Sequence, residues 1–135
     1  MRPGLHIFAD DGQPDQRPFD VAVVIPSLLR PTLKHALDSV FAQMGHLRVQ
    51  IMIGVDVAPP DGAQDMLEQV CQGRPEGWTV QVLWPGYSTS ERHGGFGKAW
   101  DGGVLRSVLS QLSNAPRIAY LDDDNWWAPD HLHSL

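Results

Sequence analysis

Apolar and polar positions recur along the chain with two different periods, which predict strands and helices. Residues 21–25 are an uninterrupted apolar run closed by a proline, as is typical of a strand buried on both faces. A second strand is predicted over residues 49–55 and ends at an aspartate. In residues 78–84 apolar and polar side chains alternate, so this third strand should be half exposed and lie at a sheet edge. Residues 117–121 form the fourth predicted strand.

Three segments between these strands have the spacing of amphipathic helices. Residues 33–44 place apolar side chains at i, i+3, i+4 and i+7 after Pro31, which is tolerated in a first helical turn. Residues 63–71 and 99–112 show the same spacing. A short last helix can begin at Pro129.

Strands that alternate with helices predict an α/β fold with a mostly parallel open sheet of about four strands, flanked by helices. Numbered along the chain, the strands should lie in the order 3-2-1-4. The order then reverses between the first and fourth strands, where a ligand crevice forms at the carboxyl ends of the strands. Residues 1–19 are polar and rich in proline, glycine and aspartate, so they should form a flexible lead-in to one domain over residues 20–135.

Composition and charge narrow the class of protein. The 135 residues are 42% hydrophobic and 19% charged, as in an ordinary globular domain. A formal charge of −6 argues against a general nucleic-acid binder. No apolar run reaches about 18 residues, so we expect no membrane span, and the start of the chain has no signal-peptide core. The single Cys71 cannot form an internal disulfide, so a reducing, cytoplasmic compartment fits best.

Three consecutive aspartates, Asp122, Asp123 and Asp124, follow the fourth strand. Adjacent carboxylates repel each other by about 1 kcal/mol at 4 Å in water and by more in a drier cleft. A divalent cation turns this repulsion into attraction, and Mg²⁺ and Mn²⁺ prefer oxygen ligands. In an extended segment Asp122 and Asp124 point to the same side and can share one ion. The alternative is a solvated acidic turn that caps the last helix, but the position at the predicted crevice favours a function.

Asp56, which ends the second strand, and the loop after the third strand are further candidates for ligand binding. An acid at the tip of the second strand can accept hydrogen bonds from a ribose or base, although an Asx-turn before the following proline pair is equally plausible. The first turn, PSLLRP, lacks the glycines of a dinucleotide fingerprint. The loop SERHGGFGKAW could meet an anion at a helix start, with Arg92 and Lys98 supplying positive charge. A plain flexible loop is the alternative.

The remaining candidates have commoner structural explanations. Trp126 and Trp127 could form an aromatic wall for a sugar, although tryptophan more often packs in a core. The histidines are expected at the surface or in caps, and His93 in the glycine loop is the strongest candidate among them for a function. Cys71 lies on an apolar helix face and should be part of the core. No Ser-His-Asp arrangement or zinc spacing is visible.

Four segments in this order resemble the family-2 glycosyltransferases with the GT-A fold: VAVVIPSLLRPTLKHALDSVFAQ, GVDV, the loop with ERHGG, and AYLDDDNWWAPDHL. The resemblance covers about residues 21–132. It implies a Rossmann-like domain that binds a nucleotide-diphosphate sugar, most often a UDP-sugar. It also implies transfer of that sugar, with inversion, to an acceptor that the sequence does not identify.

The resemblance further implies roles for individual residues. The residues expected to bind the nucleotide sugar are Pro26, Ser27, Asp56, Arg92, Asp122 and Asp123. The expected metal ligands are Asp124, the better candidate, and Asp122, with Mn²⁺ or Mg²⁺ as the ion. The general base should lie beyond Leu135, so the chain resembles the donor-binding half of a longer enzyme, incomplete at its C-terminus.

Two other functions stay open. The chain could be a nucleotide-sugar-binding module without catalysis of its own. It could also be a Mg²⁺-dependent α/β enzyme that acts on phosphates through the acid cluster. That enzyme would be expected to carry an acid at the end of the first strand as well, where Pro26 and Ser27 stand.

Overall fold

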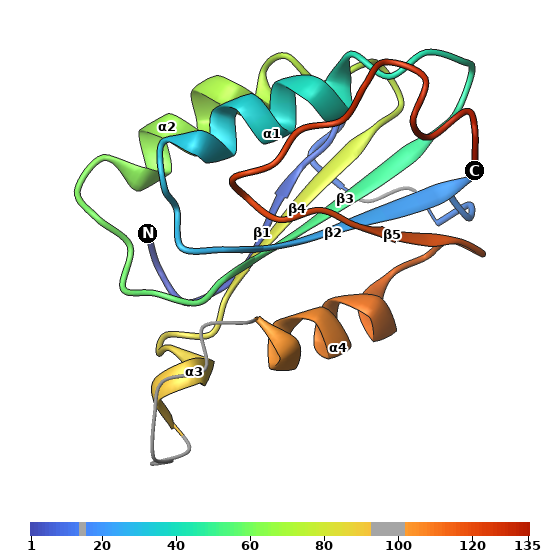
Figure 1. The fold of residues 1–135 in the computed structure, drawn as a ribbon. Helices are drawn as coiled ribbons and strands as arrows, with labels where there is room; N and C mark the ends of the chain where they lie inside the picture. Colours follow the sequence, from blue (N-terminus) through green and yellow to red (C-terminus); the bar gives the residue numbers. More distant parts are fainter. Residues whose placement is uncertain (14–15, 93–101) are drawn as a thin grey trace.

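The computed structural model describes residues 1–13, 16–92 and 102–135, without the side chain of Arg92. Within this part of the chain, five strands form one sheet in the order β1-β4-β3-β2-β5 (Figure 1). The strands are β1 (Gly4–Phe8), β2 (Val21–Ser27), β3 (Val49–Val55), β4 (Thr79–Trp84) and β5 (Ile118–Tyr120). The helices are α1 (Thr32–Phe41), α2 (Ala63–Cys71), α3 (Thr89–Arg92) and α4 (Gly103–Leu112).

The four strands predicted from the sequence are β2, β3, β4 and β5. They run parallel to one another and have the expected neighbours, with β2 between β3 and β5. The sheet is nevertheless mixed and has five strands, because β1 pairs antiparallel with β4. The expected order of the four parallel strands is therefore correct. The expected number of strands is wrong, and β1 rather than β4 forms that edge of the sheet.

β1 lies within residues 1–19, for which composition predicts a flexible lead-in. Its five residues are too short a run to stand out locally, but its backbone pairs with the edge that β4 would otherwise leave open. Phe8 packs against the main core, and Phe19, at the end of the same segment, is fully buried. This segment is part of the sheet because it pairs with a strand that is distant in the sequence. Composition alone cannot reveal such a pairing.

The alternation in β4 has a different cause from the expected edge position. Its polar residues Thr79 and Gln81 are buried, and β1 covers its outer side. The Gln50 side-chain amide donates to Oε1 of Gln81 at 2.6 Å, and the N–H of Asn114 donates to Oε1 of Gln50 at 2.7 Å. The polar positions of β4 are thus satisfied inside the protein rather than by solvent.

Helices cover both faces of the sheet, with α1 and α2 on one side and α4 on the other (Figure 1). The buried residues of α1 are Leu33, Ala36, Leu37 and Val40. On the opposite face, Leu109 of α4 packs with Val24 and Met52. A Cβ atom at Gly54 would lie 2.9 Å from Leu109 Cδ1, so this glycine allows α4 to approach β3 closely.

β2 continues through Pro26, where the sequence predicts the strand to end. The N–H of Ala22 donates to the carbonyl of Arg117 at 2.9 Å, and the N–H of Leu121 donates to the carbonyl of Val24 at 3.1 Å. Alternate residues of β2 therefore direct their backbone groups towards β5. Because β5 ends before it reaches Pro26, the missing proline N–H removes no hydrogen bond from the ladder. The strand consequently carries Ser27 to the carboxyl edge of the sheet.

The short helix expected from Pro129 is not formed, and residues 129–134 make turns instead. The N–H of His131 bonds to the carbonyl three residues earlier, and the buried Leu132 is anchored through its N–H to the side chain of Gln43. The helix predicted over residues 99–112 is α4, which begins at Gly103; residues 99–101 lie outside the described part. No helix described here is long and apolar enough to cross a membrane.

Candidate functional site

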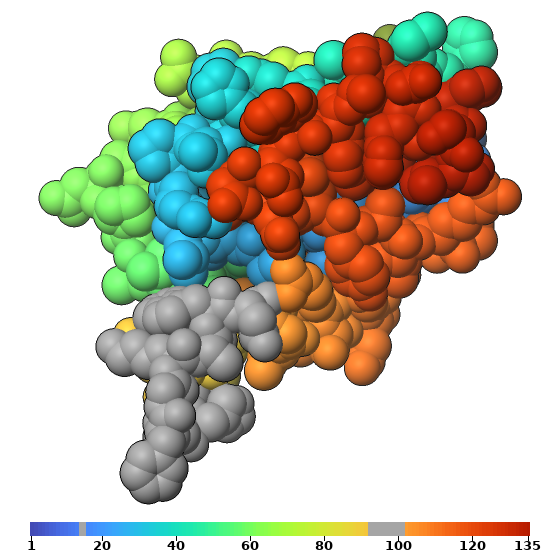
Figure 2. All heavy atoms as spheres, viewed as in Figure 1, coloured from blue at the N-terminus to red at the C-terminus, as the bar shows by residue number. Residues whose placement is uncertain are grey.

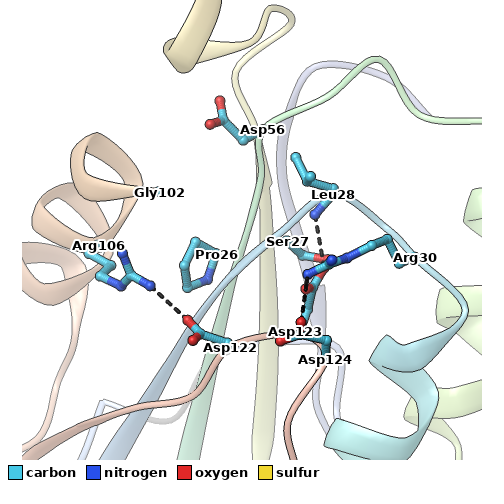
Figure 3. Close-up of a pocket in the computed structure, with 10 residues that line it drawn as sticks. All are labelled: Pro26, Ser27, Leu28, Arg30, Asp56, Gly102, Arg106, Asp122, Asp123 and Asp124. Atoms are coloured by element: carbon cyan, nitrogen blue, oxygen red, sulfur yellow. Dashed lines mark hydrogen bonds and ion pairs between the residues drawn. The ribbon is translucent and has the colours of Figure 1, made fainter. Parts of the chain in front are cut away.

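A cavity of about 370 Å³ opens at the carboxyl ends of β2 and β5 (Figure 3). From β2 the chain builds the sheet in one direction through β3 and β4, then returns to place β5 on the other side of β2. This reversal is the place where parallel α/β sheets bind ligands. The residues that line the cavity are Pro26, Ser27, Leu28, Arg30, Asp56, Gly102, Arg106, Asp122, Asp123 and Asp124. Every site residue expected from the sequence is among them except Arg92, whose side chain lies outside the described part.

Asp123 is buried and joins the end of β5 to the turn after β2. One oxygen of its carboxylate accepts the hydroxyl of Ser27 at 2.9 Å and the N–H of Leu28 at 3.0 Å. The guanidinium of Arg30 donates to the other oxygen. Ser27 Oγ in turn accepts the N–H of Leu29 at 2.9 Å, where the backbone has a positive φ of 54°. The resemblance implies that Asp123 binds the nucleotide sugar, but both of its carboxylate oxygens form hydrogen bonds within the protein. Asp123 thereby holds the turn after β2 at the wall of the cavity.

Asp122 and Asp124 face opposite sides of the cavity (Figure 3). Nη2 of Arg106, in the first turn of α4, donates to Asp122 Oδ1 at 2.7 Å. Nη2 of Arg30 lies 3.6 Å from Asp124 Oδ2. The backbone turns here, since the N–H of Asn125 donates to the carbonyl of Asp122 at 3.1 Å. The expectation that the two carboxylates project together from an extended segment is therefore wrong, because a turn and two arginines separate them.

The electrostatic environment of Arg30 follows from these contacts. The hydrogen bond with Asp123 is the main cause that raises the pKa of the Arg30 guanidinium. Burial is the next largest influence and opposes it, whereas the charges of the three aspartates act in the same direction as the hydrogen bond. Arg30 therefore stays positively charged at every working pH. Arg30 and Arg106 are the two arginines that line this cavity together with four carboxylates.

Asp56 is 2% exposed, and its carboxylate holds the start of α3. Oδ1 accepts the N–H of Thr89 at 2.5 Å and the hydroxyl of the same residue at 2.8 Å. Oδ2 accepts the hydroxyl of Ser90 at 2.5 Å, and Ser88 Oγ lies 3.4 Å from Oδ1. Asp56 therefore caps the distant helix α3. The sequence predicts a ribose contact or a local Asx-turn instead.

Four of the lining residues were missed by sequence reasoning: Leu28, Arg30, Gly102 and Arg106. Arg30 had one usable signal, since it follows Ser27 in the same turn after β2. Gly102 has a φ of 71°, and a Cβ atom there would lie 2.5 Å from Pro26 Cβ. The start of α4 therefore contacts the end of β2, which places Arg106 beside the acids; no local pattern marks this contact.

The donor atoms of the cavity fit a divalent cation that arrives with a phosphate ligand. Among the described residues no three His, Cys, Asp or Glu side chains are grouped as a complete metal site. Mg²⁺ is usually held by one or two carboxylates and completes its shell with water and substrate phosphates. Asp124 is better placed than Asp122 to act as a ligand, because its neighbour Arg30 is engaged mainly by Asp123. Asp122 is held more closely, by Arg106.

The other candidates from the sequence lie away from the cavity or outside the described part. Trp127 stacks on His131 with ring centroids 4.4 Å apart and packs against the main core, whereas Trp126 is exposed. Cys71 is a core residue as expected, and burial raises the pKa of its thiol to about 12. His93 and Lys98, with the glycine loop, lie outside the described residues.

Comparisons with known proteins relate this arrangement to a family. The family model described as Glycosyl transferase family 2 matches residues 22–135. A search of curated proteins found no match. Among solved structures, S. aureus TarS is similar with a TM-score of 0.63 and 14% identity over 85% of this chain and 18% of that chain. S. aureus TarS 1–349 in complex with UDP is similar with a TM-score of 0.66 and 13% identity over 85% of this chain and 30% of that chain. At these identities the likeness shows a shared fold, and this chain spans 30% or less of the length of those chains.

Proposed function

Because the chain belongs to glycosyl transferase family 2, we propose that its cavity binds the diphosphate of a nucleotide sugar and that the protein transfers the sugar to an acceptor. UDP is the proposed nucleotide, since a structure with the same fold, S. aureus TarS 1–349, was solved in complex with UDP. The observation that carries the proposal is the meeting of the turn after β2, Asp56 and the acids after β5 around one cavity at the reversal of strand order.

The charge of the cavity argues for a divalent cation, Mn²⁺ or Mg²⁺, in the bound state. Four carboxylates and two guanidiniums line the cavity, which leaves a formal charge of −2. A diphosphate is itself anionic, so it would be repelled unless a cation accompanied it. We propose Asp124 as its ligand from the protein, because Asp122 faces the other side of the cavity and is paired with Arg106. Arg30 and Arg106 offset the remaining negative charge.

The proposed reaction is attack of an acceptor hydroxyl oxygen on the anomeric carbon of the donor sugar. The bond from that carbon to the diphosphate oxygen breaks, and UDP leaves with the electron pair. The hydroxyl proton passes to a general base. The cation would stabilise the charge that gathers on the leaving diphosphate. Pro26 and Ser27 form the wall against which we expect the nucleoside to lie, and Arg92 is proposed to lie near the donor.

Calorimetric titration of UDP into the chain tests this proposal. With Mn²⁺ present we expect binding that EDTA abolishes and that Asp124→Asn weakens tenfold or more. The matched control is Asp130→Asn, an exposed acid that does not line the cavity. Affinity that is indifferent both to the metal and to Asp124 would contradict the proposal.

A nucleotide-sugar-binding module without catalysis is the second candidate. The cavity residues account for nucleotide binding, which is all that this candidate requires. It requires the same metal-dependent titration but no release of UDP from a UDP-sugar. A coupled assay for UDP release, run with the protein that passes the titration, separates the two functions.

A further inference from the structure

Trp126 is the most exposed of the large hydrophobic side chains that the structure describes, with 72% of its surface accessible. The backbone that carries it is fixed on both sides. On one side, the N–H of Asn125 bonds to the carbonyl of Asp122. On the other, the N–H of Trp127 donates to Ser39 Oγ at 3.1 Å, and the ring of Trp127 packs against the core. The backbone around Trp126 is therefore held in place while its indole is exposed to solvent. The segment that contains it lies at the surface between α1 and α4 (Figure 2).

One side of this indole borders a separate hollow of about 440 Å³, lined by Thr32, His35, Ser39, Asp124 and Trp126. Asp124 lines both this hollow and the cavity at the end of β2, so the two spaces share this residue. The residues that line the hollow carry an indole, an imidazole, two hydroxyls and a carboxylate. A volume of this size is typical of a small-molecule site.

We propose that this hollow is the acceptor site and takes a neutral pyranose ring against Trp126. The inference rests on the proposed glycosyl transfer and names the acceptor class. A pyranose has an apolar face of C–H groups, which packs on an indole, and a rim of hydroxyls, which can bond to Asp124, His35 and Thr32.

The position and the charge of the hollow support this choice. A hydroxyl of a sugar bound there would face the donor cavity across Asp124, the residue that borders both spaces. No lysine or arginine is among the described residues that line the hollow, so a phosphate or carboxylate group would find neither cation in its lining. A neutral sugar therefore fits better than an anionic one.

Saturation-transfer NMR with methyl glycosides of glucose, galactose, mannose and N-acetylglucosamine tests the proposal. We expect transfer to at least one of these probes, reduced about tenfold or more by Trp126→Ala and partly restored by Trp126→Phe. The matched control is Leu112→Ala, which truncates another exposed apolar side chain that borders neither cavity and should leave the transfer unchanged. UDP titration of the same variants should give unchanged affinities.

The outcomes separate this inference from the proposed function. The proposed acceptor site alone is wrong if UDP binds but none of the four probes receives magnetic saturation from the protein. It is also wrong if Trp126→Ala leaves that saturation transfer intact. Transfer to a probe without UDP binding overturns the proposed donor site instead. Self-association of the chain that Trp126→Ala abolishes would mean that protein, rather than sugar, covers the indole, and would also overturn the inference.

Discussion

The carboxylate of Asp123 lies 2.9 Å from the hydroxyl of Ser27 and joins two segments that are 96 residues apart in the sequence. Both residues are buried, and the same carboxylate accepts the N–H of Leu28 and the guanidinium of Arg30. The wall of the candidate donor cavity is thus held together by a hydrogen-bonded cluster around a single buried acid.

Replacement of Asp123 should therefore destabilise the fold as well as the site. Asp123→Ala leaves the hydroxyl of Ser27 and the N–H of Leu28 without a partner, and each buried unsatisfied group costs about 1–3 kcal/mol. We expect the free energy of unfolding to fall by about 3 kcal/mol in urea titrations. Asp130→Ala, at an exposed position, should change it by less than about 0.5 kcal/mol. Equal effects of the two substitutions would contradict the structural role given to Asp123.

Asp56 should control the order of α3. Three of its four hydrogen-bond donors reach Oδ1 and one reaches Oδ2, so Asp56→Asn can keep the Oδ1 contacts while Asp56→Ala loses all of them. We expect hydrogen exchange of the Thr89 amide to accelerate about tenfold or more in Asp56→Ala, corresponding to about 1.4 kcal/mol, and much less in Asp56→Asn. Unchanged exchange in both variants would show that Asp56 does not hold this helix.

Gly102 should be required for the contact between α4 and β2. Gly62 is a matched control, because both glycines precede a helix with positive φ, 71° and 82°, but a Cβ atom at Gly62 meets nothing within 4 Å. Gly62→Ala should cost about 1–2 kcal/mol through its backbone conformation alone. Gly102→Ala also forces a Cβ atom against Pro26 and should cost about 1–3 kcal/mol more and weaken UDP binding. Equal losses of stability for the two variants would refute the close contact.

The buried thiol of Cys71 makes stability depend on alkaline pH. Burial raises the pKa of Cys71 from its ordinary value of 9.0 to about 12. Above pH 9 the unfolded chain releases this proton while the folded chain keeps it, so the free energy of unfolding falls by up to about 1.4 kcal/mol per pH unit until pH 12. Between pH 8 and pH 10.5 the wild type should lose about 2 kcal/mol more than Cys71→Ala. Parallel pH profiles of the two proteins would show that the thiol does not titrate in this way.

Much of the fold could be predicted because its signals are local. The apolar runs of β2 and β3 and the helical spacing of α1 and α2 are recorded in consecutive residues, and the alternation of strands with helices implies the order of the parallel strands. β1 could not be predicted, because its five residues become a strand only through pairing with β4. Gln81 looks solvent-exposed from the sequence for the same reason, although its side chain is buried and pairs with that of Gln50.

The candidate site was predictable in place but not in detail. The strand order alone brings Pro26, Asp56 and the acids after β5 to one edge of the sheet. The orientation of those acids depends on Arg30 and Arg106, which come from the turn after β2 and from α4. Their contacts arise only when the elements have packed, which a reading of each motif in isolation does not reveal.

The central claim is that a divalent cation joins a diphosphate to the acids after β5, and the line broadening that Mn²⁺ causes in the amide NMR spectrum tests it most directly. With UDP present, broadening should be strongest for residues 122–125 and should extend to 27–30 and 102–106. It should be weak at Asp10 and Asp11, an acidic pair beside a different cavity, and should decrease sharply without UDP or in Asp124→Asn. Broadening centred on Asp10 and Asp11, or independent of both UDP and Asp124, would contradict the account.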